Sequence, residues 1–370
     1  MASDLVGQVI DGRYRIVSVL GAGGVGAVYR AEQAGGGPQV ALKMLHDEYG
    51  TDAESRERFQ REARALNGLQ HPNIVGVVDF GMTPEGPYLV MELLDGRPLD
   101  AFLEKPAPEP VLALELVRQV VAGLAYAHAQ GVIHRDMKAE NVYVATLADG
   151  TFCAKILDFG LAKFVDDERW GPAQKLTMMG AVFGTPAYMS PEQGTGQKVD
   201  ARSDVYSTGV VLFEALTGMW PYMGEERMDM LRLHLMAPVP KLAESREDLE
   251  VRPELQAVVD KAMAKLPEDR FANAGEMLRA LDAVPSPGAW KRGAPVALGQ
   301  PASAIGGRQP SYRPQAQPPV GSALEQPSMS YAQAQSNGSG GAPWAMIAVG
   351  LGIALLAVLA LGVAAALFVF

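Results

Sequence analysis

One short stretch, residues 134–141 (HRDMKAEN), limits the interpretation of this chain more than any other part of it. It places an Asp two residues after a His, a Lys two residues further on and an Asn three residues beyond that, and a second Asp follows in the D-F-G of residues 158–160. Phosphoryl transfer needs a carboxylate to orient and deprotonate a hydroxyl, a cation to neutralise the γ-phosphate, and oxygen ligands for Mg²⁺. These residue types in this order predict a phosphoryl-transfer site built on a loop.

A glycine-rich segment near the N-terminus, residues 21–28 (GAGGVGAV), fits the same chemistry. Because they lack a Cβ, Gly21, Gly23 and Gly26 let backbone N–H groups approach phosphate oxygens closely. A G-x-G-x-x-G pattern also occurs in dinucleotide-binding βαβ units, but there it opens a helix, whereas here it joins two stretches typical of strands. The segment also lacks the G-K-[ST] ending of a P-loop, and a lysine arrives instead on the next predicted strand, as Lys43.

These segments, together with V-A-L-K at residues 40–43 and S-P-E at residues 190–192, resemble the motifs of the eukaryotic-like (Hanks-type) protein kinases, in their bacterial serine/threonine branch. The resemblance covers residues 8–284, about three quarters of the chain. It implies an α+β, bilobal protein-kinase fold, with a small antiparallel β-sheet lobe that holds one helix and a larger, mostly α-helical lobe. It also implies transfer of the ATP γ-phosphate to Ser or Thr hydroxyls of protein substrates, with Mg²⁺, or Mn²⁺ as the alternative, as the metal ion.

The hydrophobic pattern agrees with this order of lobes. Runs rich in β-branched and aromatic residues predict strands at residues 14–20, 27–30, 40–45, 74–80 and 88–93. Apolar residues at helical spacing predict helices at residues 54–69, 111–130, 205–217 and 255–265. We expect the cleft between the lobes at about residues 92–96.

The resemblance implies a role for each polar residue of the transfer site. Asp136 is expected to orient and deprotonate the substrate hydroxyl, and Lys138 to stabilise the charge on the transferring phosphate. Asn141 and Asp158 are expected to bind Mg²⁺. A lysine at the position of Lys138 is typical of the serine/threonine-specific members of the family.

Lys43 is expected to contact the α- and β-phosphates. A lysine on an apolar strand needs a carboxylate partner, because burying it unpaired is costly. The resemblance assigns that role to Glu62, in the helix that follows, and Glu54 and Glu57 are the nearby alternatives.

The resemblance also implies a nucleotide pocket between the lobes. Met91 would be the gatekeeper, with backbone groups of Glu92 and Leu94 facing the adenine. Tyr143 departs from the family pattern, which generally has an aliphatic residue beneath the adenine, and its larger ring would tighten or reshape the pocket. The complete expected set is Leu20, Gly21, Gly23, Gly26, Val28, Ala41, Lys43, Met91, Glu92, Leu94 and Tyr143.

An activation segment with a regulatory phosphate is implied as well. Thr177 is the sole Ser or Thr between Asp158 and Thr185, so we expect it to be autophosphorylated and its phosphate to pair with Arg135. The alternative is that Thr177 is an ordinary loop residue. Thr185 is expected to bond to Asp136 and Lys138.

Several further residues are expected to form the scaffold beneath the site. Glu192 should pair with Arg270, and Asp204 should anchor the catalytic loop from beneath. A hydrophobic spine is expected from Leu66, Val77, His134 and Phe159.

The C-terminal quarter has a different composition. Residues 285–343 are rich in Pro, Gln, Ser and Gly, which predicts a disordered juxtamembrane linker. Residues 345–370 contain no charged side chain, and Trp344 precedes them, so we expect a transmembrane helix over residues 344–370 rather than a buried core helix. We expect no ectodomain, a kinase domain in the cytoplasm at the inner membrane, and a homodimer if Gly350 and Ala354 form a helix-pairing motif.

Charge and cysteine content exclude other classes. The formal net charge of −10 and the sequence pI of about 5.1 argue against nucleic acid as a partner. One cysteine, Cys153, cannot form an intramolecular disulfide and fits a reducing compartment.

Two alternative functions stay open. A pseudokinase acting as a signalling scaffold would lack the lysine, the base or a metal ligand, and this chain has all of them. A small-molecule kinase would commonly lack the G-T-P-A-Y and S-P-E segments found at residues 184–192.

Overall fold

The computed structural model describes residues 2–23, 26–46, 53–104, 108–159, 186–246 and 251–284. The chain divides into two compact units, residues 1–303 and 304–370, and all described residues lie in the first of them.

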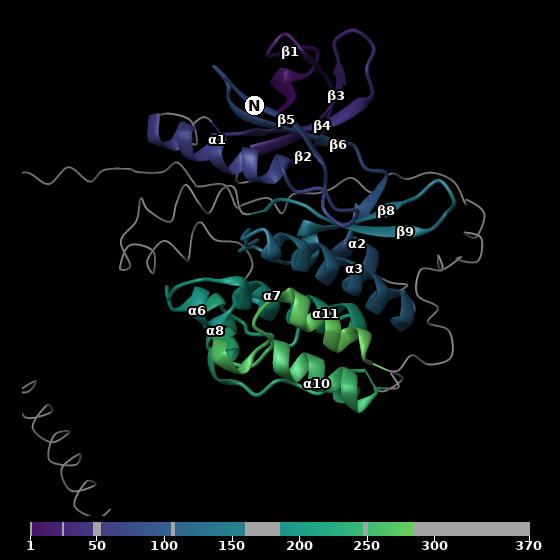
Figure 1. Cartoon of the computed structure of the whole chain (residues 1–370), viewed down its shortest axis with the longest axis vertical. Helices are drawn as coiled ribbons and strands as arrows, with labels where there is room; N and C mark the ends of the chain where they lie inside the picture. The colour runs from purple at the N-terminus through teal and green to yellow at the C-terminus, as the bar shows by residue number, and fades with distance from the viewer. Residues whose placement is uncertain are drawn as a thin grey trace, which may run out of the picture. The chain divides into compact units, whose positions relative to one another are not determined.

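A six-stranded antiparallel sheet with the order β1-β2-β3-β4-β6-β5 forms the N-terminal lobe (Figure 1). Along β3, buried and half-buried side chains alternate, and the buried Ala27, Tyr29 and Ala31 pack in a small core on one face. The strands are β1 (Val9–Ile10), β2 (Tyr14–Gly23), β3 (Gly26–Gln33), β4 (Gln39–Leu45), β5 (Val77–Thr83) and β6 (Gly86–Glu92), preceded by a 3₁₀ turn, η1 (Ala2–Leu5).

Helix α1 (Ala53–Asn67) is the helix of this lobe and packs against β5. Its buried residues Phe59, Ala63 and Leu66 recur at the spacing of one helix face, and the ring of Phe59 meets that of Phe80 edge-on. This face joins the larger hydrophobic core, which continues into the C-terminal lobe.

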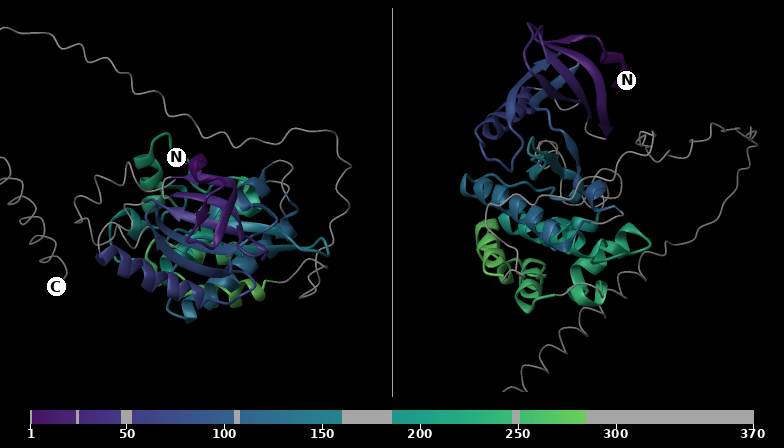
Figure 2. Two further views of the ribbon diagram at one scale, coloured as in Figure 1. Left: turned by 90° about the horizontal axis from the view of Figure 1, so that it is seen from above. Right: turned by 90° about the vertical axis from the view of Figure 1, so that its right-hand side faces the viewer.

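A second, three-stranded sheet lies between the N-terminal sheet and the main group of helices, as Figure 1 and the right-hand view of Figure 2 show. Its strands are β7 (Gly96–Pro98), β8 (Val142–Thr146) and β9 (Phe152–Ile156). Residue Val142 of β8 is fully buried, and the β8–β9 hairpin rests on α3. The hairpin therefore forms the upper surface of the C-terminal lobe.

The C-terminal lobe is helical, and its central helix is α7. Nearly every residue of α7 is buried, because α3, α10 and α11 surround it. Asp200 caps its N-terminus by accepting from the Arg202 backbone N–H, and Gly218 ends it in a left-handed conformation with φ 74°. The helices are α2 (Leu99–Leu103), α3 (Pro110–Ala129), α6 (Pro191–Gly194), α7 (Ala201–Thr217), α8 (Arg227–Met236), α9 (Leu242–Ser245), α10 (Pro253–Ala262) and α11 (Ala274–Asp282), with 3₁₀ turns η3 (Ala139–Asn141), η4 (Pro186–Tyr188) and η5 (Pro267–Asp269).

The observed elements confirm the predicted bilobal α+β fold, with one local correction. The predicted strand at residues 74–80 begins at Val77, because Ile74 forms an isolated parallel bridge with Ile156 of β9 instead of joining the N-terminal sheet. The N–H of Val75 donates to the Ile156 carbonyl at 2.9 Å, and the Ile156 N–H donates to the Asn73 carbonyl at 2.9 Å.

The predicted C-terminal transmembrane helix lies outside the described residues. Within the described ranges, α3 is the helix long and apolar enough to cross a membrane by length and composition. Since α3 packs against α7, α11 and β9, its apolar residues serve the core of the C-terminal lobe.

Candidate active site

The catalytic loop is held from beneath by Asp204, near the start of α7. This carboxylate is almost completely buried and accepts hydrogen bonds from the backbone N–H groups of His134 and Arg135, both at 2.7 Å. Arg135 adopts a left-handed conformation with φ 65°, which is uncommon for a residue other than glycine. The two bonds to Asp204 stabilise this strained loop and confirm the expected anchoring role.

His128, at the end of α3, is a second buried contact of Asp204 and was not identified from the sequence. Its Nε2 lies 2.9 Å from a carboxylate oxygen of Asp204, and its Nδ1 accepts from the backbone N–H of Ala274 at 3.2 Å. Because Nδ1 is the acceptor, the proton of the neutral ring must be on Nε2, which donates to Asp204. The sequence signal that could have indicated this contact was a polar residue on the buried side of an otherwise apolar helix.

Asp136, Lys138 and Asn141 converge as the sequence predicted. The Lys138 ammonium lies 3.3 Å from Asp136 Oδ2, and the Asn141 amide nitrogen donates to the Asp136 carbonyl at 2.7 Å and to Oδ2 at 3.1 Å. Burial opposes the charge on Lys138, but the nearby carboxylates of Asp136 and Glu140 outweigh it and raise the pKa of Lys138 above its ordinary value. The lysine therefore stays cationic beside the expected base.

Lys43 has a different carboxylate partner from the one expected. Its ammonium forms an ion pair with Asp158 Oδ1 at 2.7 Å, and its side chain is 13% exposed. The expected pair between Lys43 and Glu62 is not formed in this structure. Glu54 pairs with Arg58 at 2.8 Å, and Glu57 is exposed, so neither alternative carboxylate takes the place of Glu62.

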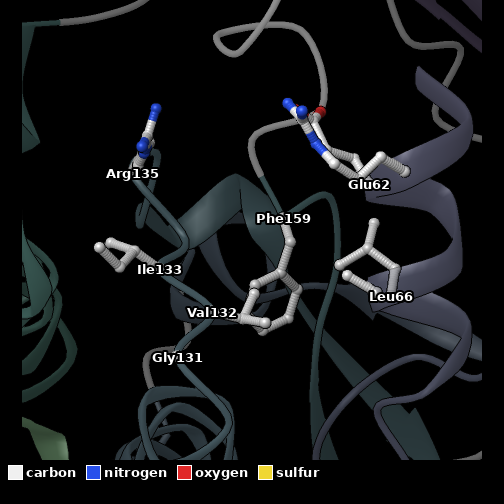
Figure 3. Close-up of a pocket in the computed structure, with 9 residues that line it drawn as sticks. Glu62, Leu66, Gly131, Val132, Ile133, Arg135 and Phe159 are labelled. Carbon is white, nitrogen blue, oxygen red and sulfur yellow. The ribbon is translucent and has the colours of Figure 1, made fainter. Parts of the chain in front are cut away.

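Glu62 faces a cavity between α1 and the catalytic loop (Figure 3). The cavity has a volume of about 230 Å³ and is also lined by Leu66, Arg135 and Phe159. Both carboxylate oxygens of Glu62 are buried, and neither has a hydrogen-bond partner within the described part of the chain. Burial raises the pKa of Glu62 to about 7, against the opposing effect of neighbouring arginines, so its carboxyl group is partly neutral near physiological pH. Because the carboxyl group is partly neutral, Glu62 can stay buried without pairing with Lys43.

The hydrophobic spine is present. The rings of His134 and Phe159 lie 4.8 Å apart, and Phe159 and Leu66 line a second small cavity together with Val77 and Met91. Burial lowers the pKa of His134, whose Nε2 lies 2.8 Å from the Leu157 carbonyl. A neutral, buried ring is suited to packing against Phe159 rather than to acid–base chemistry.

The glycines at the ends of β2 and β3 are of two kinds, which differ in whether a side chain would fit there. A Cβ on Gly26, where φ is 154°, would lie 2.0 Å from the Met44 carbonyl oxygen, so the fold itself requires this glycine. A Cβ on Gly21 or Gly23 would meet no atom within 4 Å among those described. The absence of a side chain at these two positions therefore has no packing cause, which is consistent with a ligand approaching the backbone there.

The remaining pocket residues lie along β2, β3, β4 and β6. Val28 is opposite Lys43 in the β3–β4 ladder, and Ala41 is opposite Met91 in the β4–β6 ladder. Leu20, on β2, is 46% exposed. These strands thus place the expected adenine-contacting side chains on neighbouring positions of one sheet.

Glu92 lies at the start of the segment that joins the lobes, and Tyr143 of β8 contacts the end of that segment. Lys155 Nζ lies 2.7 Å from Glu92 Oε1, which also accepts from the Gly76 N–H at 2.8 Å. The hydroxyl of Tyr143 donates to the carbonyl of Gly96 at 2.8 Å. The sequence singled out Tyr143 and Glu92 but gave no indication of Lys155.

The expected scaffold pair Glu192–Arg270 is formed and is bidentate. Arg270 donates from its two terminal nitrogens to the two carboxylate oxygens of Glu192, at 2.7 and 2.9 Å. The expected phosphorylation site Thr177 and the expected loop contact Thr185 lie outside the described residues.

Comparisons with known proteins agree with this geometry. A family model described as protein kinase domain matches residues 14–280. The chain is 38% identical over 283 residues to serine/threonine-protein kinase pkn3 of Myxococcus xanthus, covering 76% of this chain and 51% of that protein, and 40% identical over 279 residues to pkn2 of the same organism, covering 75% and 33%. The match thus spans between a third and a half of the length of these curated relatives.

Solved structures give the same result. The crystal structure of the Mycobacterium tuberculosis PknI kinase domain resembles this fold with a TM-score of 0.58 and 28% sequence identity, covering 75% of this chain and 98% of that one. Since the family model covers more than half of the sequence and the structural match includes both lobes, this chain belongs to the protein kinase family, among relatives that are bacterial serine/threonine-protein kinases.

Proposed function

We propose that this protein is a serine/threonine protein kinase that transfers the γ-phosphate of ATP to Ser and Thr hydroxyls of protein substrates. The observation that carries the proposal is the arrangement around Asp136, whose carboxylate lies between the ammonium of Lys138 and the amide of Asn141. This places a hydroxyl-orienting group, a cation and an oxygen ligand within one short loop, as phosphoryl transfer requires.

In the proposed reaction, Asp136 orients the substrate hydroxyl and accepts its proton. Lys138 neutralises charge on the γ-phosphoryl group as it passes from ATP to that hydroxyl. Because Lys138 lies close to Asp136, both side chains can reach the same transferring phosphoryl group. Leu20, Val28, Ala41 and Met91, on β2, β3, β4 and β6, are proposed to surround the adenine.

Asn141 and Asp158 fit a divalent metal such as Mg²⁺. Asn141 uses its amide nitrogen for both hydrogen bonds to Asp136, and its amide oxygen is an acceptor that no described residue engages. A carboxylate and an amide oxygen are hard ligands of the kind that Mg²⁺ prefers, alongside phosphate oxygens and water. When bound, the metal would neutralise charge on the nucleotide phosphates.

The pairing of Lys43 is proposed to change when nucleotide binds. The ion pair between Lys43 and Asp158 occupies both a phosphate-binding and a metal-binding group. If Asp158 binds the metal, Lys43 becomes free to contact the phosphates and to pair with Glu62. Glu62 lies on the adjacent helix with no competing hydrogen bond among the described residues.

The proposal also covers the domain organisation of the whole chain. We propose a kinase domain over residues 8–284, a juxtamembrane linker over residues 285–343 and a transmembrane helix over residues 344–370, which would hold the kinase at the cytoplasmic face of the inner membrane. The uncharged run that ends the sequence supports this membrane anchor. Dimerisation through Gly350 and Ala354 is the corresponding proposal for the helix.

Regulation by autophosphorylation is proposed at Thr177. Its phosphate would pair with Arg135, which adjoins the catalytic base, so that the charge of the modification acts directly on the catalytic loop. The activation segment that carries Thr177 also includes Thr185, the proposed contact of Asp136 and Lys138.

The test is phosphate transfer by the full chain in detergent, with radiolabelled ATP and Mg²⁺, to itself and to a generic protein. We expect label on Ser and Thr in the wild type and none in Asp136→Asn, which keeps the shape of the side chain but removes its charge. If the wild type binds nucleotide and transfers nothing, the scaffold alternative replaces the kinase. Mapping the labelled residues then shows whether Thr177 is phosphorylated.

A further inference from the structure

The segment that joins the two lobes, residues 92–96, is attached at both ends to the β8–β9 hairpin. At its start, Glu92 pairs with Lys155 of β9 at 2.7 Å. At its end, the Gly96 carbonyl accepts from the hydroxyl of Tyr143 of β8 at 2.8 Å. The carbonyl of Asp95 also accepts from the Thr146 N–H at 2.8 Å. We call residues 92–96 the interlobe segment.

Both side chains that hold the interlobe segment project from one face of the hairpin. Tyr143 and Lys155 are partners in the β8–β9 ladder, and side chains of paired residues lie on the same face of a sheet. The neighbours of Tyr143 along β8, Val142 and Val144, are 0% and 1% exposed and belong to the core on the opposite face. Tyr143 and Lys155 are therefore directed away from the helical core and toward the interlobe segment.

The register of these contacts is fixed by Gly96. Its φ is 152°, and a Cβ there would lie 2.1 Å from the Val144 carbonyl oxygen. Gly96 is opposite Ala145 in the ladder, while Tyr143 is opposite Pro98, so the phenol reaches diagonally across two positions to the Gly96 carbonyl. An aromatic side chain spans such a diagonal, and an aliphatic one brings no donor to it.

No described residue forms a hydrogen bond with the backbone in the middle of the interlobe segment. The backbone of Leu94 takes part in none of the hydrogen bonds found within the described residues. The Glu92 N–H is already used by the Gly76 carbonyl, at 2.9 Å. The two attachments thus present the Leu94 backbone at a fixed position between Lys155 and Tyr143.

We propose that Tyr143 is a positioning residue for nucleotide binding, which acts by holding the interlobe segment on the hairpin together with Lys155. The proposal rests on the proposed kinase function, because it takes the nucleotide base to bind this segment. Preorganisation lowers the ordering cost of binding. Loss of the Tyr143 hydroxyl therefore weakens nucleotide affinity and leaves the chemical step unchanged, since the catalytic loop that carries Asp136 and Lys138 is anchored separately, by the bonds from His134 and Arg135 to Asp204.

The experiment uses the full chain in detergent and the variants Tyr143→Phe, Lys155→Met and the double variant. Tyr143→Phe removes one hydroxyl and keeps the ring. The matched control is Tyr222→Phe, which removes a tyrosine hydroxyl bonded to the Pro238 carbonyl at 3.2 Å in the helical lobe. Binding of a fluorescent ADP analogue, steady-state kinetics in ATP, and amide hydrogen exchange of residues 92–96 in nucleotide-free protein are measured for each.

We expect Tyr143→Phe to raise the Kd of the analogue and the KM for ATP by about threefold to tenfold, with kcat within about twofold. Exchange of residues 92–96 should accelerate in Tyr143→Phe and not in Tyr222→Phe. The double variant should exceed the product of the single effects, because each attachment partly compensates for the loss of the other.

Three results would overturn the inference. Unchanged Kd and hydrogen exchange in Tyr143→Phe would show that the Tyr143 hydroxyl does not position the interlobe segment for nucleotide binding. An equal rise of Kd in Tyr222→Phe would show a general loss of stability instead. Absence of nucleotide binding by the wild type would overturn the proposed function, and with it this role, whereas a binding wild type with an unaffected Tyr143→Phe would overturn this role alone.

Discussion

The ammonium of Lys43 and the carboxylate of Asp158 neutralise each other across the interior of the site, at 2.7 Å. The two groups come from different lobes, β4 in the sheet and the segment that follows β9. Glu62 of α1 makes no hydrogen bond with this lysine or with any other residue in the described part of the chain. The structure therefore presents a site with its charged groups assembled but paired differently from the arrangement proposed for transfer.

Replacing Lys43 should remove activity and leave stability nearly intact. In Lys43→Met we expect the rate of phosphate transfer to fall by at least about 100-fold, because the phosphates lose a cation placed for the transition state. The Asp158 side chain is 36% exposed and can be solvated, so the free energy of unfolding should change by less than about 1 kcal/mol. Transfer assays and urea unfolding check both. Comparable activity in Lys43→Met would exclude this lysine from the mechanism.

Glu62 should make nucleotide-free protein less stable as the pH rises. Its pKa is raised by burial from 4.5 to about 7, so the native state holds a proton that the unfolded state releases. The corresponding stability is complete below pH 4.5 and is lost as the pH approaches 7. Glu62→Gln should therefore gain about 1–2 kcal/mol over the wild type at pH 8 and nothing at pH 4.5, after allowance for partial solvent screening.

The same variant should transfer phosphate more slowly, because the pair proposed for Lys43 is lost. Thermal unfolding at the two pH values, beside a transfer assay, is the measurement. A variant that is less stable than the wild type at pH 8 would show that Glu62 is ionised and paired in solution.

His128 should contribute to the placement of the catalytic loop. In His128→Leu, Asp204 loses one hydrogen bond and the Ala274 N–H loses its acceptor, which should cost about 1–3 kcal/mol of unfolding free energy. Transfer should also slow, since Asp204 positions the backbone of His134 and Arg135. His128→Asn, which keeps a donor and an acceptor, should recover part of the rate. A stability loss with an unchanged rate would limit His128 to a structural role.

The Glu192–Arg270 pair should be sensitive to the shape of the cation. Arg270 is completely buried and Glu192 is 4% exposed, so Arg270→Met leaves a carboxylate buried and should cost about 3–5 kcal/mol. Arg270→Lys keeps the charge but cannot reproduce two parallel bonds, so an intermediate loss is expected.

The pH dependence of this pair has the opposite sign to that of Glu62. Burial raises the pKa of Glu192, but hydrogen bonds from Arg270 and Ser203 outweigh burial and hold it below 4.5. The stability it contributes is present above pH 4.5 and is lost as the pH falls through the lowered pKa. The difference between wild type and Glu192→Gln in urea unfolding should thus shrink under acidic conditions. A difference that is constant between pH 7 and pH 3 would argue against the pair.

The sequence predicted the fold well because the signals were local. Runs of β-branched and aromatic residues located β2, β3, β4 and β6, and apolar periodicity located α1, α3, α7 and α10 to within a few residues. Among the predicted strands, the exception was the segment at Ile74 and Val75. Its β-branched residues resemble a strand, but their backbone groups pair with Ile156, a residue about 80 positions away that a local pattern cannot indicate.

The residue types of the site were predicted, but the partner of Lys43 was not. The motifs identified Asp136, Lys138 and Asn141, whose spacing along one loop brings them together. The partner of Lys43 depends on how α1 is placed relative to β4, which is a tertiary property. His128 and Lys155 belong to no motif, and their roles follow from contacts between distant elements.

The bridge between Ile74 and Ile156 has a mechanical consequence. The segment that leads into β5 meets the β8–β9 hairpin there, on β9, and the segment that leaves β6 meets it at Gly96, beside β8. Two fixed points on one rigid body define a line, and rotation about that line is the rigid-body freedom that they leave to the sheet. Opening of the lobes should therefore follow a single angular coordinate, with its axis along the hairpin, and the segments farthest from that axis, such as the tip of β2 and β3, should travel the greatest distance.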